Sequence, residues 1–283
     1  MDLKSRWNGE VSTEVFHGVK EIVAEEAGVD LGSYKDKCIK RRIAVRVRLT
    51  GSSSAESYLL QLKEDKEERK KLVAVLTINV TQFFRNSAVF DKVGEIVLPK
   101  LFDKRKNDSM VRMPLKIWSA GCSSGEEPYS IAILLLEKFK KEFGQFGASI
   151  LGTDLDEKVL QKASEGVYSE KCLGEISPEL KGRYFSPQPD NCYRITDDVR
   201  RLVLFEKDNL LEKGVFERQD IIFCRNMLIY VSREEQERVL IRFADYLHPE
   251  GFLVLGKSEA LIGTSRELFN AICPYERIYQ KKS

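Results

Sequence analysis

The residue types most able to do chemistry stand together in one short stretch, WSAGCSSGEEPYS at residues 118–130. Gly121 and Gly125 bracket a turn of small residues, and Glu126 and Glu127 follow it directly. A β-like run, a tight turn and a helix start in this order predict a cradle for a nucleotide or adenosyl ligand. Two carboxylates at that place would repel a phosphate and attract a ribose or a positively charged ligand. The stretch therefore favours a cofactor without phosphates over ATP or GTP.

Polar side chains also follow other β-like runs. Asp154 ends the second run, where a doubly wound sheet meets ribose hydroxyls, and a carboxylate accepts hydrogen bonds from hydroxyls. The alternative role for such an acid is a helix N-cap, for which Asp156 is better placed. Asn209 could hydrogen-bond an adenine edge. Arg225 and Asn226 stand at the carboxyl end of the fourth run, on the side where ligands bind.

The elements that position these residues change in kind along the chain. From about residue 12 to 88 the pattern is helical, and we predict helices at 15–27, 31–49, 54–63 and 64–77. From residue 115 short β-rich runs alternate with helices, which indicates a mainly parallel sheet covered on both faces. We predict strands at 115–120, 148–153, 203–206, 221–224 and 252–255, with a final strand pair near 268–280. Helices are expected at 126–143, 157–163 and 233–247.

Two segments depart from this alternation. Residues 185–206 contain a proline-bearing break flanked by β-like runs, which predicts a small antiparallel excursion from the main sheet. Residues 103–108, DKRKND, are interpreted as a solvated loop before the first strand.

A basic segment stands in the helical part of the chain. At 100° per residue Lys37, Arg41 and Arg48 share one helix face, while Ile39 and Ile43 lie roughly opposite and would pack inward. The segment could be a solvated face, but exposed helices ordinarily mix charges of both signs. Residues 37–48 contain no acid, which favours a docking surface for an acidic partner, and no interleaved aromatic residue that would favour nucleic acid. The basic residues are Lys37, Lys40, Arg41, Arg42, Arg46 and Arg48.

Composition excludes several kinds of site. The six cysteines are scattered without a C-x-x-C pair, and His17 and His248 are far apart, so we expect no metal site, disulfide framework or serine–histidine triad. The net charge of +2 implies no polyanion partner. No apolar run approaches the ~20 residues of a membrane span, and the first ten residues lack a signal-peptide core. We expect a cytoplasmic protein without membrane insertion.

In their order along the chain, TINVTQFFRN (77–86), WSAGCSSGEEPYS, LGTDLD (151–156) and FCRNMLIYV (223–231) resemble the CheR family of chemotaxis receptor methyltransferases. The resemblance covers nearly the whole chain, to the terminal ERIYQ. It implies an α/β fold: a Rossmann-like class I methyltransferase sheet with a small antiparallel β excursion, preceded by an all-helical N-terminal domain. It also implies methyl transfer from S-adenosylmethionine to receptor glutamates in sensory adaptation, with S-adenosylhomocysteine as product and no metal.

The resemblance assigns roles to individual positions. Asp154 should hold the ribose, and Asn209 and Leu210 should flank the adenine. Arg85 would orient the substrate carboxylate, and Tyr230 would add a hydrogen bond or shape the methyl channel, unless it is only packed at a strand end. The implied cofactor-binding residues are Asn79, Thr81, Arg85, Glu126, Glu127, Asp154, Asn209, Leu210, Arg225 and Asn226.

The same resemblance divides the chain into domains and gives it a partner. Residues 1–88 would be a basic receptor-docking domain with its linker, and 89–283 the catalytic domain, with an antiparallel subdomain at about 185–206. The partner would be the cytoplasmic helical domain of chemotaxis receptors, whose acidic stripe suits docking by Lys37, Arg41, Arg42, Arg46 and Arg48. Some members of the family bind a pentapeptide at the receptor's C-terminus and tend to have a longer, glycine-containing loop in the antiparallel excursion. Here the loop SPQPDNC (186–192) is short and lacks glycine, so the resemblance implies an enzyme that does not depend on the pentapeptide. We expect a monomer.

Two other functions stay open from the sequence. A Rossmann-like methyltransferase for a small molecule or nucleic acid would share the cofactor motifs but needs no basic helical domain. A non-catalytic receptor-binding module would have a degenerate site.

Overall fold

The computed structural model describes residues 7, 9–27, 31–76, 81–107, 113–174, 176–212 and 217–283. The chain divides into two compact units. One comprises the residues up to Asn79 with Tyr230–Glu235, and the other comprises Val80–Ile229 with Gln236–Ser283. The division after Asn79 lies upstream of residue 88, where we placed the end of the helical domain. No sequence pattern indicated that Tyr230–Glu235 would join the first unit.

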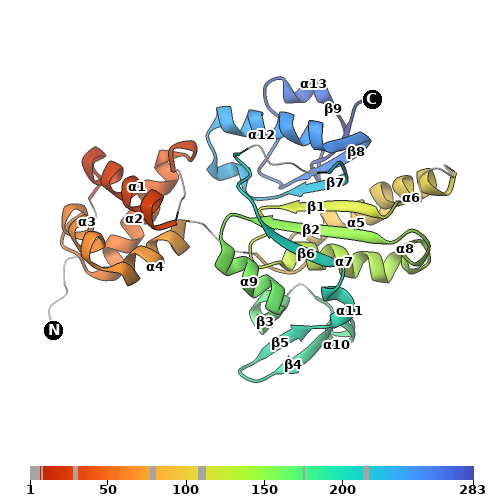
Figure 1. Ribbon diagram of the computed structural model, residues 1–283, viewed down its shortest axis with the longest axis horizontal. Helices are drawn as coiled ribbons and strands as arrows, with labels where there is room; N and C mark the ends of the chain where they lie inside the picture. Colours follow the sequence, from red (N-terminus) through yellow and green to blue (C-terminus); the bar gives the residue numbers. More distant parts are fainter. Residues whose placement is uncertain are drawn as a thin grey trace. The chain divides into compact units, whose positions relative to one another are not determined.

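The described part of the first unit is helical, as predicted (Figure 1, red to orange). The apolar face expected on the basic helix is confirmed, because Ile39, Ile43 and Val47 are buried. Ser54 and Ser57 form a capping box, in which each side chain accepts the other residue's backbone N–H and so starts the third helix. The elements are α1 (Thr13–Ala27), η1 (Leu31–Ser33), α2 (Asp36–Thr50), α3 (Ala55–Glu64) and α4 (Lys66–Leu76).

The second unit is built on a mixed sheet. Its strands are β1 (Leu115–Ala120), β2 (Ala148–Asp154), β6 (Val203–Lys207), β7 (Gln219–Cys224), β8 (Leu247–Leu255), β9 (Phe269–Cys273) and β10 (Ile278–Lys281). Within the described residues their order is β6-β2-β1-β7-β8-β10-β9. The first five of these strands run parallel, and β10 is antiparallel to β8 and β9. All the strands predicted for this sheet are present, so the prediction of a mainly parallel α/β fold is confirmed.

The sheet alternates with helical elements along the chain. They are α5 (Ser87–Lys92), η2 (Val93–Val97), α6 (Leu98–Asn107), α7 (Glu126–Lys138), α8 (Lys140–Phe146), α9 (Glu157–Glu165), η3 (Glu170–Leu173), α10 (Pro178–Tyr184), α11 (Asp197–Arg200), η4 (Leu228–Tyr230), α12 (Arg233–Tyr246) and α13 (Ser265–Leu268). The predicted helix 126–143 is divided at Phe139 into α7 and α8.

Helices cover both faces of the sheet because the central strands are apolar on both sides. Ile117 and Ile221 belong to one core, and their neighbours Trp118 and Ile222 belong to the other. The first core includes residues of α5, α6 and α7, and the second includes residues of α12.

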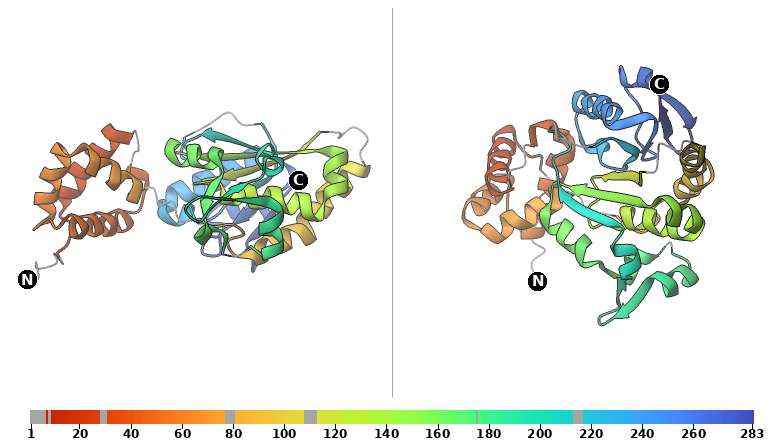
Figure 2. Two further views of the ribbon diagram at one scale, coloured as in Figure 1. Left: turned by 90° about the horizontal axis from the view of Figure 1, so that it is seen from below. Right: turned by 45° about the vertical axis from the view of Figure 1, so that its right-hand side comes forward.

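A small antiparallel sheet is present as expected, apart from the main sheet (Figure 1; Figure 2, right). Its strands lie in the order β3 (Val167–Ser169), β5 (Cys192–Ile195) and β4 (Phe185–Gln188). The predicted extent of 185–206 is wrong at both ends. β3 comes earlier in the chain, and its three residues are too few to show a period. Residues 203–206 pair in parallel with β2 and so belong to the main sheet.

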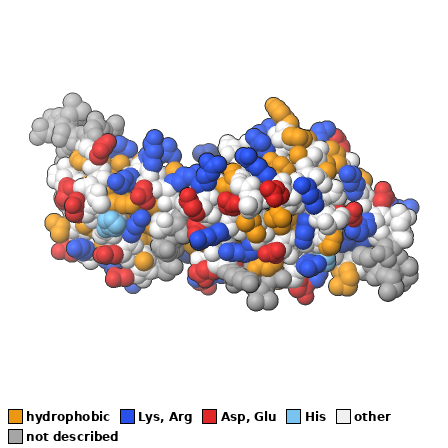
Figure 3. Space-filling model, turned by 90° about the horizontal axis from the view of Figure 1, so that it is seen from above, with side chains coloured by type: hydrophobic (Ala, Val, Ile, Leu, Met, Phe, Trp, Pro, Cys, Tyr) orange, Lys and Arg blue, Asp and Glu red, His pale blue; other side chains and the backbone are white. Residues whose placement is uncertain are grey.

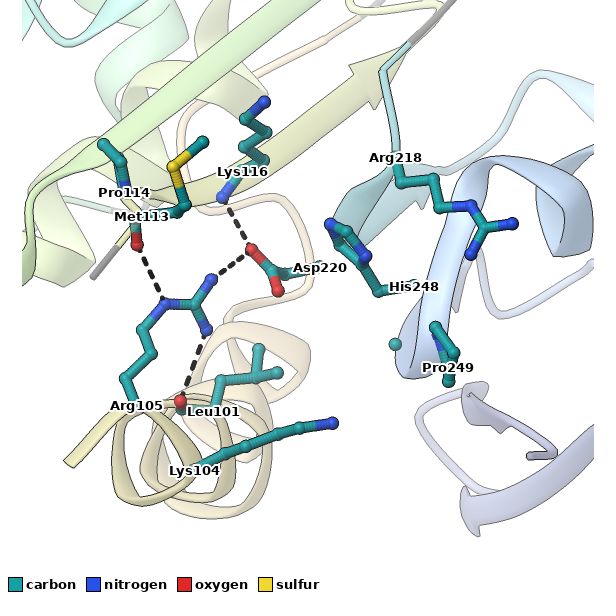
Figure 4. Close-up of a pocket in the computed structure, with 11 residues that line it drawn as sticks. Leu101, Lys104, Arg105, Met113, Pro114, Lys116, Arg218, Asp220, His248 and Pro249 are labelled. Atoms are coloured by element: carbon teal, nitrogen blue, oxygen red, sulfur yellow. Dashed lines mark hydrogen bonds and ion pairs between the residues drawn. The ribbon is translucent and has the colours of Figure 1, made fainter. Parts of the chain in front are cut away.

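The interpretation of 103–108 as a solvated loop is wrong for 103–107, which are the end of α6. Arg105 is buried there, and its Nη2 donates to Asp220 Oδ2 at 2.5 Å (Figure 4). Its other nitrogens donate to the carbonyls of Leu101 and Met113, both at 3.3 Å. The sequence shows only that several charged residues stand next to one another, and this does not indicate which of them is buried. Residue 108 lies outside the described residues.

In the described ranges, the helices are all too short or too polar to cross a membrane. On the face drawn in Figure 3, acidic and basic side chains are interspersed, in keeping with the small net charge.

Candidate cofactor and active site

The turn after β1 has a backbone that only small residues adopt easily. Gly121, Ser123 and Gly125 have φ values of 72°, 51° and 91°. The N–H groups of Gly121 and Cys122 donate to the Thr153 carbonyl at 2.8 Å, which ties the turn to the end of β2. A Cβ on Gly125 would lie 2.8 Å from the Cβ of Ala163, so no side chain fits there. α7 then begins at Glu126.

Asp154, at the carboxyl end of β2, hydrogen-bonds the turn that follows β1. Its Oδ2 accepts the Ser123 N–H at 2.8 Å, and its Oδ1 accepts the Asp156 N–H at 3.0 Å. Burial raises the pKa of Asp154, while these two N–H groups act against the rise. Asp156 caps α9 by accepting the Lys158 N–H at 3.0 Å, so the capping role falls on Asp156. Each Asp154 oxygen keeps a lone pair for a hydroxyl donor.

Glu127 and Arg225 form a buried ion pair, with 3.0 Å between Oε2 and Nη1. Their side chains are 13% and 3% exposed. Ser119 Oγ donates to the other oxygen of Glu127 at 2.8 Å. Arg225 Nη2 donates to the Arg85 carbonyl at 2.7 Å. The structure thus brings Arg85, Glu127 and Arg225 together from segments far apart in sequence.

Glu126 points elsewhere, because neighbouring residues on a helix differ by 100° in direction. Its side chain is buried, and Oε2 accepts the hydroxyl of Ser124 at 2.8 Å. Burial raises its pKa. Of the two glutamates, Glu127 is the one that meets the arginine.

The predicted adenine-flanking residues follow β6. The Asp208 N–H donates to the Asp154 carbonyl at 3.1 Å, which places this segment beside the end of β2. Asn209 accepts the Leu211 N–H at 3.2 Å, and Leu210 is buried in the second core.

The described part of TINVTQFFRN is fixed by its aromatic residues. Phe83 is fully buried and packs edge-on against Tyr168 and Phe185, with centroids 4.9 and 5.0 Å apart. The Phe84 N–H donates to Ser130 Oγ on α7 at 2.8 Å. Phe83 is therefore core, and Arg85, two residues further along the chain, is half-buried. Thr81 is also half-buried, while Asn79 lies outside the described residues.

Tyr230 lies in the first unit. Its carbonyl accepts the Lys35 N–H at 2.9 Å, and the Arg42 guanidinium carbon lies 4.9 Å from its ring centroid. Arg42 also donates to the carbonyls of Val75 and Leu76, at 3.1 and 2.6 Å. Burial lowers the pKa of Arg42.

Some basic residues of α2 form contacts within the helical unit, and others are exposed. Arg46 forms a two-pronged pair with the buried Glu68, at 2.9 and 2.6 Å, and Tyr58 donates to the same carboxylate at 2.8 Å. Arg42 and Arg46 are therefore engaged in contacts within the unit. The exposed basic residues among the predicted docking set are Lys37, Arg41 and Arg48.

Asn226, after β7, has a left-handed backbone with φ 61°. Its N–H donates at 2.9 Å to Oε2 of Glu259, a residue that the sequence analysis missed. The sequence does carry a signal for Glu259, because it is an acidic residue shortly after the end of β8, and the carboxyl ends of β8 and β2 lie at the same edge of the sheet.

A cavity of about 360 Å³ lies at the opposite, amino end of the strands (Figure 4). Arg105, Lys116, Asp220 and His248 line it. The Arg105–Asp220 pair is structural, and Lys116 pairs with Glu217 outside the cavity lining. Because ligands of open α/β sheets bind at the carboxyl ends of strands, this cavity is not the cofactor site.

The sheet order, the glycine turn and the acid ending the second strand define a class I S-adenosylmethionine-dependent methyltransferase. Residues 14–77 match the family described as "CheR methyltransferase, all-alpha domain", and residues 79–275 match "CheR methyltransferase, SAM binding domain". The chain belongs to the CheR methyltransferase family, so the predicted identity and fold class are confirmed.

Relatives named chemotaxis protein methyltransferases agree with this assignment. The one from Vibrio parahaemolyticus is 32% identical over 96% of this chain and 98% of its own. The one from Borreliella burgdorferi is 33% identical over 86% of this chain and 87% of its own. Chemotaxis protein methyltransferase 2 of Pseudomonas aeruginosa is 35% identical over 89% of this chain and 88% of its own.

Proposed function

We propose that this methyltransferase transfers a methyl group from S-adenosylmethionine to glutamate side chains of chemotaxis receptors. The observation that carries the proposal is the convergence of Asp154 and the Glu127–Arg225 pair at the carboxyl ends of β1, β2 and β7. Membership of the CheR family supports the methyl donor and the link to chemotaxis.

The groups at this edge fit the cofactor. Asp154 has acceptor capacity for ribose hydroxyls, and Leu210 offers an apolar surface for adenine. Among the described residues nothing accepts from the buried Nε of Arg225, which could donate to the cofactor's carboxylate. Glu127 supplies negative charge suited to the cofactor's cationic end. When bound, the cofactor supplies an electrophilic methyl group.

Methylation of a glutamate needs no general base, because a free carboxylate with a pKa of ~4.3 is ionised at neutral pH. The nucleophile is negative and the methyl donor positive, so charge is lost on the way to products, and a site with little water favours such a step. The remaining task is alignment of oxygen, methyl and sulfur. We assign Arg85 to orienting the substrate carboxylate through a charge-assisted hydrogen bond. The channel-shaping role that the resemblance gave to Tyr230 stays a prediction.

Receptor docking is assigned to the exposed face of α2. Lys37, Arg41 and Arg48 are exposed there, on the side opposite the buried Ile39 and Ile43. A helical receptor with an acidic stripe carries the complementary charge. Because the receptor surface would be cytoplasmic, the proposal places the enzyme in the cytoplasm.

We also propose that docking requires no receptor tail peptide. The β4–β5 connection turns within residues 189–191, where Asp190 and Asn191 have φ values of 57° and 52°. So short a turn offers little extra surface beyond the two strands.

The test is incorporation of tritiated methyl into cytoplasmic receptor fragments with and without their C-terminal tails, beside RNA and small organic acids. We expect label in both receptor fragments at similar rates. Label only in RNA or in small acids would support the alternative methyltransferase. Tight S-adenosylhomocysteine binding without label anywhere would support the non-catalytic module.

A further inference from the structure

Glu259 is a buried carboxylate in the turn that follows β8. It is 5% exposed. Among the described residues no lysine, arginine or histidine forms an ion pair with it. A buried carboxylate is costly unless hydrogen bonds stabilise it, so its partners show what it holds.

Those partners are backbone N–H groups. Oε2 accepts the N–H of Asn226 at 2.9 Å and of Gly256 at 2.7 Å. Oε1 has no hydrogen-bond partner among the described residues. Burial raises the pKa of Glu259, and backbone N–H groups, those of Asn226 and Gly256 first, oppose the rise. One of the two donors thus belongs to Asn226, which directly follows Arg225, and the other to Gly256, which directly follows β8.

The carboxylate packs closely against Gly256, where no side chain would fit. A Cβ on Gly256 would lie 2.6 Å from Oε2 and 2.8 Å from the Asn226 nitrogen. Asn226 itself has φ 61°, in the left-handed region, which asparagine adopts more readily than most residues other than glycine. The hydrogen bond from its N–H to Glu259 helps to hold that conformation.

We propose that Glu259 is a positioning residue that fixes the backbone at Asn226 and through it the Arg225 guanidinium beside Glu127. Because Arg225 also holds the Arg85 carbonyl, the same carboxylate sets the geometry of the two arginines. The expected effect on methyl transfer rests on the proposed function, whereas the expected effect on the backbone at Asn226 does not.

The test compares Glu259→Gln with Glu276→Gln. Glu276 is equally buried, at 5% exposed, but pairs with Lys257 instead of a backbone segment. In Glu259→Gln the amide oxygen can still face the two N–H groups, but the negative charge that strengthens both hydrogen bonds is lost. We expect a fall of about tenfold or more in kcat for methyl transfer. S-adenosylhomocysteine affinity should fall as well, because Arg225 is also assigned to the cofactor's carboxylate, whereas Glu276→Gln should leave both kcat and affinity unchanged.

Hydrogen exchange gives a readout independent of the substrate. In Glu259→Gln the amides of Asn226 and Gly256 should exchange faster while β7 stays protected, and in Glu276→Gln both should match the wild type. Gly256→Ala, which presses on the carboxylate from the other side, should reproduce the faster exchange if Glu259→Gln folds poorly.

The outcomes separate the two proposals. Wild-type protein that fails to methylate receptors contradicts the proposed function, while the exchange pattern still decides the role of Glu259. Unchanged exchange at Asn226 in both Glu259→Gln and Gly256→Ala, or equal losses of kcat in Glu259→Gln and Glu276→Gln, would overturn the inference.

Discussion

Arg225 and Glu127 are 98 residues apart in sequence and form a buried ion pair of 3.0 Å that joins the end of β7 to the first turn of α7. Removing one partner leaves the other charge buried without its counterpart. We therefore expect Glu127→Ala to lower the free energy of unfolding by about 3 kcal/mol and S-adenosylhomocysteine affinity by about tenfold or more.

Urea denaturation and isothermal titration would measure both effects. The matched control is Arg201→Ala, which breaks an ion pair of 2.9 Å with Asp198 whose side chains are both 72% exposed. That change should cost less than about 1 kcal/mol. Equal losses of unfolding free energy in the two variants would show that the buried Glu127–Arg225 pair stabilises the protein no more than an exposed pair.

The two aspartates after β2 should separate binding from stability. Asp154→Ala removes the acceptor proposed for the ribose and should weaken S-adenosylhomocysteine binding by about tenfold or more. Asp156→Ala removes an N-cap, which typically costs about 1 kcal/mol of stability, and should leave the dissociation constant nearly unchanged. If Asp154→Ala bound the product as tightly as the wild type, the ribose assignment would be wrong.

Cofactor binding should weaken on acidification at a higher pH than an ordinary aspartate would cause. Burial raises the pKa of Asp154 above the usual value of about 3.9, and the proposed contact uses the ionised form as acceptor. Affinity is therefore full above the raised pKa and is lost as pH falls through it. Titrations from neutral to acidic pH would test this, with Asp154→Asn giving a flatter profile. A wild-type profile identical to that of Asp154→Asn would contradict the prediction.

Arg46 and Arg41 lie on the same helix but should behave differently. Arg46→Ala leaves the buried Glu68 without its cation and should lower the stability of the helical unit by about 3 kcal/mol. Arg41→Ala removes an exposed charge and should change stability by less than about 0.5 kcal/mol. Thermal denaturation of both variants would measure the difference, and equal shifts in Tm would contradict it.

Docking by α2 predicts an effect on receptor methylation that spares the cofactor site. Reversing Arg41 and Arg48 to glutamate should raise the KM for receptor several-fold, and more strongly at low salt, because exposed charges are screened by ions. The S-adenosylhomocysteine dissociation constant should stay the same. Unchanged receptor kinetics would mean that this face is only solvated.

The sequence predicted the strands of the main sheet, because their apolar runs are short and regular, and it predicted the strand-end position of Asp154, but it missed β3. It also separated Asp156 as the cap. It could not show which charges pair across long separations. Arg105 with Asp220, Arg46 with Glu68, and Glu259 with the N–H groups near Asn226 all depend on tertiary packing. A run of basic residues looks the same in the sequence whether one of its side chains is buried in an ion pair or all of them are exposed.

Methyl transfer to a receptor glutamate is tested most directly by mass spectrometry of a receptor cytoplasmic fragment after reaction with the protein and S-adenosylmethionine, before and after mild base. We expect methyl groups on glutamate side chains, lost in base as methanol because they are esters, and fewer of them with Asp154→Ala when S-adenosylmethionine is below saturation. A base-stable methyl group, or one on a side chain other than a carboxylate, would rule out methylation of receptor glutamates.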